Sequence, residues 1–154
     1  LYLGRGNAYL DHHTTVDHAT ASGTSAQSFR GILDGASLGV FDGTILVREG
    51  AAGTDARQVN RNLLLSGSAR VETNPRLEIL ADDVKCSHGA AIGPPDEEVL
   101  FYLRSRGLTE EAAVGLLLRA FAREVLDRVP VAALRRRWIC SLDALARRER
   151  GAAA

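Results

Sequence analysis

A thiol and an imidazole stand two residues apart, at Cys86 and His88, in a segment rich in strand-forming residues. Side chains of a strand alternate between its two faces, so we expect Cys86 and His88 to share one face. Val84 falls on the same face, and this apolar neighbour indicates an interior at which Cys86 packs. Imidazole and thiolate are both common metal ligands, but two side chains cannot complete a metal site. His88 is therefore a candidate for at most one part of such a site, or a histidine satisfied by hydrogen bonds within the fold.

Histidines and carboxylates also gather in the run DHHTTVDH, residues 11–18. These are ligands of zinc and iron, so the run could form a metal site. In a strand, however, His12 and His18 share one face while His13 and Asp17 lie on the other. No three of the best ligands converge within the strand. We therefore expect structural or hydrogen-bonding roles for these residues.

Two further kinds of active site are excluded by residue pattern. Asp82 and Asp83 could suggest a general acid and base, but adjacent strand residues point apart, and no nucleophile with an orienting base lies nearby. The glycines are scattered through turns and form no GxxxxGK[ST] phosphate loop. We expect no hydrolase built on this carboxylate pair and no nucleotide bound by this chain.

The elements that position these residues change character at Gly93-Pro94-Pro95. Before this point, short aliphatic and β-branched runs alternate with Gly, Asp, Asn and Ser, and no helix of useful length fits. A sandwich, a barrel and a β-helix all remain open, because exact repeats are absent. The expected strand segments are LGVF at 38–41, TILV at 44–47 after an Asp42-Gly43 turn, NLLL at 62–65, ARV at 69–71, LEIL at 77–80 and DVKC at 83–86.

After Pro95 the pattern predicts three helices. Acidic residues from Asp96 open the first, which ends near Gly107, and Thr109 caps the second. Pro130 starts the third, with Arg135, Arg136 and Arg137 turned partly outward. The apolar positions of the second helix are Val114, Leu117, Leu118, Phe121 and Val125, and those of the third are Val131, Leu134, Trp138, Leu142 and Leu145.

Composition narrows the class of protein. The chain has 154 residues, 45% of them apolar, and a formal net charge of zero, which suits one globular domain or two small packed parts. The balanced charge disfavours a nucleic-acid partner, and the apolar runs are too short to span a membrane. The two scattered cysteines indicate reduced thiols in a cytosol. The absence of Met indicates that the sequence begins inside a longer protein.

Several ordered stretches resemble the SufB/SufD family of iron-sulfur cluster assembly scaffolds, and the string ADDVKCSHGA favours its SufD branch. The other stretches that carry the resemblance are DHHTTVDH at 11–18, SFRGILDGASLGVFDGTILVR at 28–48, QVNRNLLLS at 58–66 and DEEVLFYLRSRGLTEEAA at 96–113. The resemblance implies a right-handed parallel β-helix, its C-terminal part at residues 1–93. It also implies an α-helical subdomain at 94–150 that docks an ATPase, and a tail at 151–154.

The resemblance also implies roles for particular residues. His88 matches the histidine of the CSHGA string, which is implicated in forming a transient iron-sulfur cluster at the face shared with the SufB subunit. Cys86 is the weaker candidate, as a ligand or sulfur relay. The FYLRSRG helix of the family contributes to docking the SufC ATPase, and its matching candidates for partner binding are Phe101, Tyr102, Arg104 and Arg106.

These expectations describe a non-enzymatic, cytoplasmic scaffold subunit that pairs with SufB through strand edges and with SufC through its helices. In isolation the piece could form a homodimer through an open end of its coil. Two alternatives remain. One is an interaction module with no cluster ligand of its own, and the other is a β-helix enzyme acting on polysaccharide. The low aromatic content, 5%, counts against the enzyme.

Overall fold

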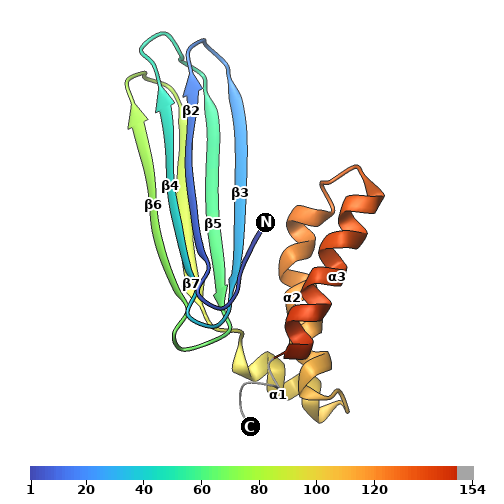
Figure 1. Cartoon of the computed structure of the whole chain (residues 1–154). Helices are drawn as coiled ribbons and strands as arrows, with labels where there is room; N and C mark the ends of the chain where they lie inside the picture. The colour runs from blue at the N-terminus through green and yellow to red at the C-terminus, as the bar shows by residue number, and fades with distance from the viewer. Residues whose placement is uncertain (149–154) are drawn as a thin grey trace. The chain divides into compact units, whose positions relative to one another are not determined.

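The computed structural model describes residues 1–148 and divides the chain into two compact units between Gly93 and Pro94 (Figure 1). We call residues 2–93 the solenoid unit and the remainder, from Pro94, the helical unit. The tail expected at 151–154 lies outside the described residues.

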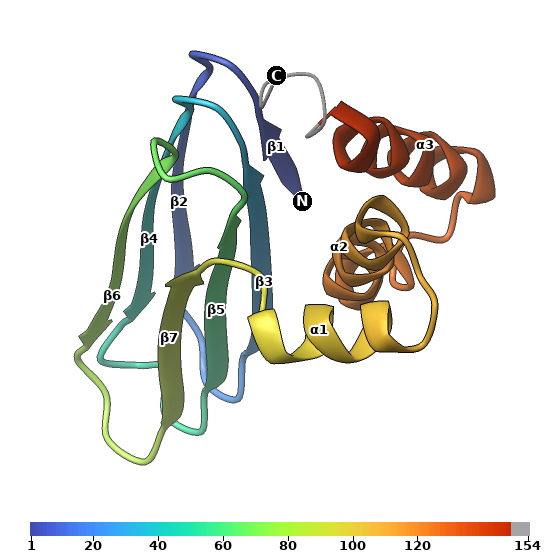
Figure 2. The same cartoon turned by 90° about the horizontal axis from the view of Figure 1, so that it is seen from below.

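The solenoid unit is built from two parallel sheets, as Figure 2 shows from the side of the strand ends. Successive strands alternate between the sheets, so that the chain coils as a parallel β-helix. This confirms the fold expected from the family resemblance. One sheet has the order β1 (Tyr2–Gly4), β3 (Thr24–Leu33), β5 (Asp55–Leu64) and β7 (Lys85–Gly93), and the other has the order β2 (Tyr9–His18), β4 (Leu38–Val47) and β6 (Arg70–Ile79).

Burial alternates with period two along most of β2, β4, β5 and β6. In β4 every second residue from Gly39 to Val47 is buried, and the residues between them are partly exposed. Equivalent inward residues recur about one coil apart. For example, Gln58 on β5 lies beside Gln27 on β3, 31 residues earlier in the chain. At the inward position that Phe41 occupies on β4, β2 has His12 and β6 has Thr73. Because neighbouring coils fill equivalent positions so differently, the sequence shows no exact repeat.

The turn expected at Asp42-Gly43 is wrong, because β4 runs through both residues. Gly43 faces the interior, where a Cβ atom would lie 2.5 Å from Cζ of Phe41 and 2.6 Å from Nε2 of Gln58. Asp42 faces outward and accepts hydrogen bonds from Asn74 (3.1 Å) and Arg76 (3.0 Å) of β6. The glycine therefore makes room for two interior side chains instead of reversing the chain.

Two apolar clusters lie within the solenoid unit, and β5 runs from one to the other. Ala56, near the start of β5, belongs to a cluster with Ile45, Val47 and Ala51. Leu64, at its end, packs against a second cluster formed by Tyr2, Leu33 and Ala69. Between these ends β5 points three buried polar side chains inward, which are Gln58, Asn60 and Asn62. The inner face of β5 is thus polar in its middle and apolar at its two ends.

The helical unit contains α1 (Glu97–Ser105), α2 (Glu110–Leu126) and α3 (Ala132–Arg148). The cap expected at Thr109 is present, and Asp96, which was expected on the first turn of α1, is the N-cap of that helix. Asp96 accepts hydrogen bonds from the backbone N–H groups of Glu98 and Val99, and Thr109 accepts one from the N–H of Ala112. Gly107 adopts φ +92°, a left-handed conformation that suits glycine after a helix. Of the described helices, none combines the length and apolar character needed to cross a membrane.

The third helix departs from the expectation in two respects. It begins at Ala132 and not at Pro130, and only the later part of its apolar stripe is buried. Leu142 and Leu145 are fully buried, whereas Val131 is 50% and Leu134 is 47% exposed.

Candidate functional site

Cys86 and His88 lie on the inner face of β7, as the alternation predicts. The parallel pairing of β7 with β5 is unbroken, with Cys86 opposite Ala56 and His88 opposite Gln58. Cys86 packs with Val84 against the apolar cluster that contains Ala56, which fixes the even-numbered residues here as inward. The thiol is therefore held among apolar side chains.

His88 is exposed although it faces inward. β7 is the last strand of its sheet, so the described structure has no further coil to cover this position. Cys86 remains partly buried, because the apolar cluster closes over it. Of the two residues, His88 is the one whose ring can reach a group outside the molecule.

A buried amide pair lies beside His88. Gln58 is fully buried, and its Nε2 donates a hydrogen bond of 2.6 Å to Oε1 of Gln27 on β3. The other amide atom, Oε1 of Gln58, is buried without a hydrogen-bond partner. The sequence interpretation missed Gln58, although polar residues at alternate positions of β5 could have indicated an inward polar row.

The three histidines of β2 have separate partners. His18 is 8% exposed, and its Nε2 lies 2.9 Å from Oγ of Ser25. The ring of His12 packs at 4.6 Å from that of Tyr2, while Nε2 of His13 lies 2.9 Å from a carboxylate oxygen of Asp11 on the outer face. These contacts match the structural and hydrogen-bonding roles expected for the run.

No group of three or more His, Cys, Asp and Glu side chains within the described residues is arranged to hold a metal ion. Asp82 and Asp83 are both exposed and lie in the turn before β7. Asp83 adopts φ +53°, and its carbonyl oxygen accepts a 2.8 Å hydrogen bond from the N–H of Gly53. This carboxylate pair shapes a turn, and any site that uses His88 needs ligands from elsewhere.

The first helix of the helical unit presents its aromatic side chains to solvent. Phe101 is 74% and Tyr102 is 55% exposed, and α1 has no buried residue. The guanidinium of Arg106 lies over the Tyr102 ring at 5.2 Å, and Arg104 lies 3.9 Å from the Glu110 carboxylate. The four candidate residues for partner binding are thus accessible on one short helix.

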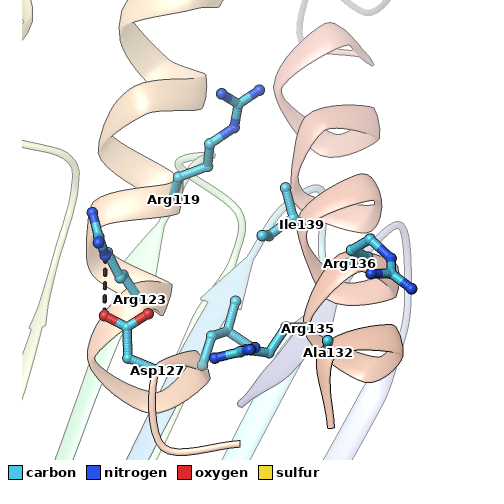
Figure 3. Close-up of a pocket in the computed structure, with 8 residues that line it drawn as sticks. Arg119, Arg123, Asp127, Ala132, Arg135, Arg136 and Ile139 are labelled. Carbon is cyan, nitrogen blue, oxygen red and sulfur yellow. Dashed lines mark hydrogen bonds and ion pairs between the residues drawn. The ribbon is translucent and has the colours of Figure 1, made fainter. Parts of the chain in front are cut away.

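A groove of about 490 Å³ lies between α2 and α3, and arginines from both helices line it (Figure 3). Arg123 donates to Asp127 at 3.0 Å, and Arg119 donates to Asp143 at 2.7 Å. The remaining lining residues are Arg135, Arg136, Leu126, Ala132 and Ile139. The groove combines an apolar floor with positive charge, a combination that suits acidic groups. The sequence did not indicate it, since its arginines come from two helices.

The sequence matches a family of known proteins. Residues 1–121 match the family described as SUF system FeS cluster assembly, SufBD core domain. An iron-sulfur cluster assembly SufBD family protein of Synechocystis is 46% identical over 132 residues, covering 86% of this chain and 29% of the relative. The iron-sulfur cluster assembly protein SufD of Escherichia coli is 42% identical over 121 residues, which cover 79% of this chain and 29% of the relative.

The SufD protein of Bacillus subtilis is 29% identical over 141 residues, covering 92% of this chain and 32% of the relative. The chain thus spans less than a third of the length of these three relatives. The family match takes in the whole solenoid unit, α1 and most of α2. The chain belongs to the SufBD family of iron-sulfur cluster assembly proteins.

Proposed function

We propose that this chain is part of a SufD-type scaffold subunit, which pairs with SufB and docks the SufC ATPase while a transient iron-sulfur cluster is built. In this role the chain catalyses no reaction of its own, binds no nucleotide and works in the cytoplasm. The observation that supports the proposal best is the position of His88. It is an exposed imidazole on the inner face of the last strand of a solenoid.

The number of available ligands favours a cluster shared between subunits. Iron-sulfur clusters are generally held by four ligands, and this part of the chain offers one exposed imidazole with one partly buried thiol behind it. Neutral imidazole binds iron and exchanges more readily than thiolate, which suits a cluster that must be passed on. SufB would supply the remaining ligands, and Cys86 would contribute mainly by packing.

The last strands of the two sheets, β6 and β7, differ as surfaces for pairing with SufB. Each has one edge that no described strand covers, so its backbone N–H and C=O groups are open to a partner strand. The outer strand of the β2-β4-β6 sheet carries Pro75, which lacks an N–H donor, whereas β7 has no proline. We therefore assign the pairing to the free edge of β7, next to His88.

Reconstitution of the cluster under anaerobic conditions tests the role of His88. The complex of SufB, SufC and the full-length subunit is prepared with His88→Ala, and iron-sulfur absorbance and bound iron and sulfide are measured. We expect a marked loss of cluster. His13→Ala is the matched control, because His13 is an exposed strand histidine whose contact is with Asp11 on the outer face.

Undiminished cluster formation with His88→Ala would remove this residue from the mechanism. If the yield also stays at the wild-type level when Cys86 and His88 are both replaced, the subunit is an adaptor without a ligand of its own. The packing of Cys86 among apolar side chains, which leaves His88 as the one exposed candidate, is the observation that favours this second function.

Docking of SufC is assigned to the exposed surface of α1. Aromatic residues and arginines are enriched at the centres of protein interfaces, and Phe101, Tyr102 and Arg106 form such a group here. In a pull-down of SufC by the full-length subunit, Phe101→Ala combined with Tyr102→Ala should weaken binding at least tenfold. Leu116→Ala on α2, where the side chain is 45% exposed, is the control. Retained binding by the double variant would refute the assignment.

A further inference from the structure

The buried amide of Gln58 has one atom with a partner and one without. Its donor end, Nε2, is directed toward β3, where it donates to Oε1 of Gln27. Its acceptor end, Oε1, is buried and has no partner in the described structure. A buried polar atom without a partner is energetically costly, so a fully buried side chain in this state calls for an explanation.

The position of Gln58 in the sheet shows where a partner can come from. β5 lies between β3 and β7, and on its inner face Gln58 is flanked by Gln27 on one side and His88 on the other. Because the nitrogen and oxygen of one amide point in different directions, the end that does not face Gln27 is free to face β7. Neighbouring strands are about 4.8 Å apart, a distance that glutamine and histidine side chains span easily.

The interior is also shaped to hold this amide. Opposite Gln58 stands Gly43, and a Cβ atom there would lie 2.6 Å from Nε2 of Gln58. Any larger residue at this position would displace the amide. The glycine and the hydrogen bond to Gln27 together keep Gln58 in place beside the exposed ring of His88.

We propose that Gln58 is a positioning residue for His88: when the exposed ring turns toward the buried Oε1, which has no partner in this structure, Oε1 accepts a hydrogen bond from one ring N–H and leaves the other ring nitrogen free to bind iron. Histidines that bind metals commonly donate their second N–H to a carbonyl or carboxylate, which fixes the tautomer and the orientation of the ring. The inference rests on the proposed role of His88 as a ligand. It deepens that role by naming the residue that prepares the ring.

Two substitutions at one position separate the hydrogen bond from packing. Gln58→Met keeps a long side chain of similar volume but has no strong acceptor, whereas Gln58→Glu retains acceptor oxygens. Asn60→Leu is the matched control. It also removes a buried amide from β5, but the residue beside Asn60 on β7 is Ala90 and not His88. Circular dichroism establishes that each variant is folded.

The first measurement needs no metal. The ring nitrogens of His88 in the full-length subunit are observed by NMR after labelling of histidine, with His88→Ala used for assignment. We expect one dominant tautomer in the wild type and in Gln58→Glu, and a mixture like that of free imidazole in Gln58→Met. A tautomer ratio in Gln58→Met equal to that of the wild type would overturn the inference.

The second measurement is anaerobic titration of Fe²⁺ into the complex of the subunit with SufB. Loss of an outer hydrogen-bond partner typically weakens metal binding about 10- to 100-fold, and we expect this loss for Gln58→Met and recovery for Gln58→Glu. Unchanged Fe²⁺ affinity in Gln58→Met, with affinity lost in His88→Ala, would overturn the positioning role alone. Unchanged affinity in His88→Ala would instead refute the ligand role of His88, even where the tautomer responds to Gln58.

Discussion

The substitution Gly43→Ala tests whether this glycine is needed for packing or for a turn. The added methyl group would lie 2.5 Å from Cζ of Phe41 and 2.6 Å from Nε2 of Gln58, whereas carbon atoms in contact are about 3.5–4.0 Å apart. Both side chains, or the backbone of β4, must therefore move by about 1 Å. Phe41 is fully buried and its ring lies 4.5 Å from that of Phe29, so it has little room to do so.

The expected cost follows from two opposing effects. Forcing an extra methyl group into a packed core costs about 1–3 kcal/mol, while replacing glycine restricts the unfolded chain and stabilises by about 0.4–1 kcal/mol. We expect Gly43→Ala to lower the free energy of unfolding by about 1–2 kcal/mol. Equilibrium unfolding in urea, followed by circular dichroism, measures this as a lower midpoint with an unchanged slope.

Gly50→Ala is the matched control. Gly50 has nothing within 4 Å of its Cβ position and is not among the residues with left-handed backbone, so its replacement should be neutral or slightly stabilising. If Gly43→Ala unfolds at the same urea concentration as Gly50→Ala, the packing argument is wrong. Phe41→Leu added to Gly43→Ala should recover part of the loss, since a smaller side chain relieves the crowding.

Two further predictions concern the outer face of the solenoid unit and the core of the helical unit. Arg48 donates to Asp17 at 2.7 Å, and these hydrogen bonds and the positive charge lower the pKa of Asp17. The pair therefore stabilises the fold above the ordinary Asp pKa, about 3.9, and loses this effect as the pH falls through the lowered value. The Tm difference between wild type and Asp17→Asn should be present at pH 7 and absent in strong acid, and a constant difference would contradict it. Leu142 on α3 is fully buried, so Leu142→Ala should lower the free energy of unfolding, measured in urea, by about 2–5 kcal/mol. A loss below about 1 kcal/mol would show that the site is loosely packed.

The sequence allowed the strand character and the inner face of β7 to be predicted, because both depend on local alternation. The helix caps at Asp96 and Thr109 were predictable for the same reason, since a cap uses side chain and backbone only a few residues apart. The turn at Asp42-Gly43 was wrong because this dipeptide is typical of turns. Its actual environment depends on Gln58, fifteen residues further along the chain, and on how the coil closes.

The candidate site was predictable only in part. His88 and its inward face follow from the sequence, but its neighbour Gln58 becomes visible only when the register of β5 and β7 is known. The same limit applies to the arginine groove, in which Arg119 and Arg136 come together only once α2 and α3 pack. Local patterns specify which way a side chain points, whereas coil closure and helix packing specify what it meets.

The position of His88 links ligand donation to subunit pairing in the proposed function. An inward histidine in the middle of a parallel β-helix is covered by strands on both sides, as Gln58 is between β3 and β7. His88 is not covered in this way, because β7 is the last strand of its sheet. The free edge of β7 that leaves the ring exposed is also the edge open to a partner strand. A partner strand on that edge would place one of its own side chains about 4.8 Å from the His88 position, opposite Gln58. The same contact that joins the subunits would therefore supply the next ligand.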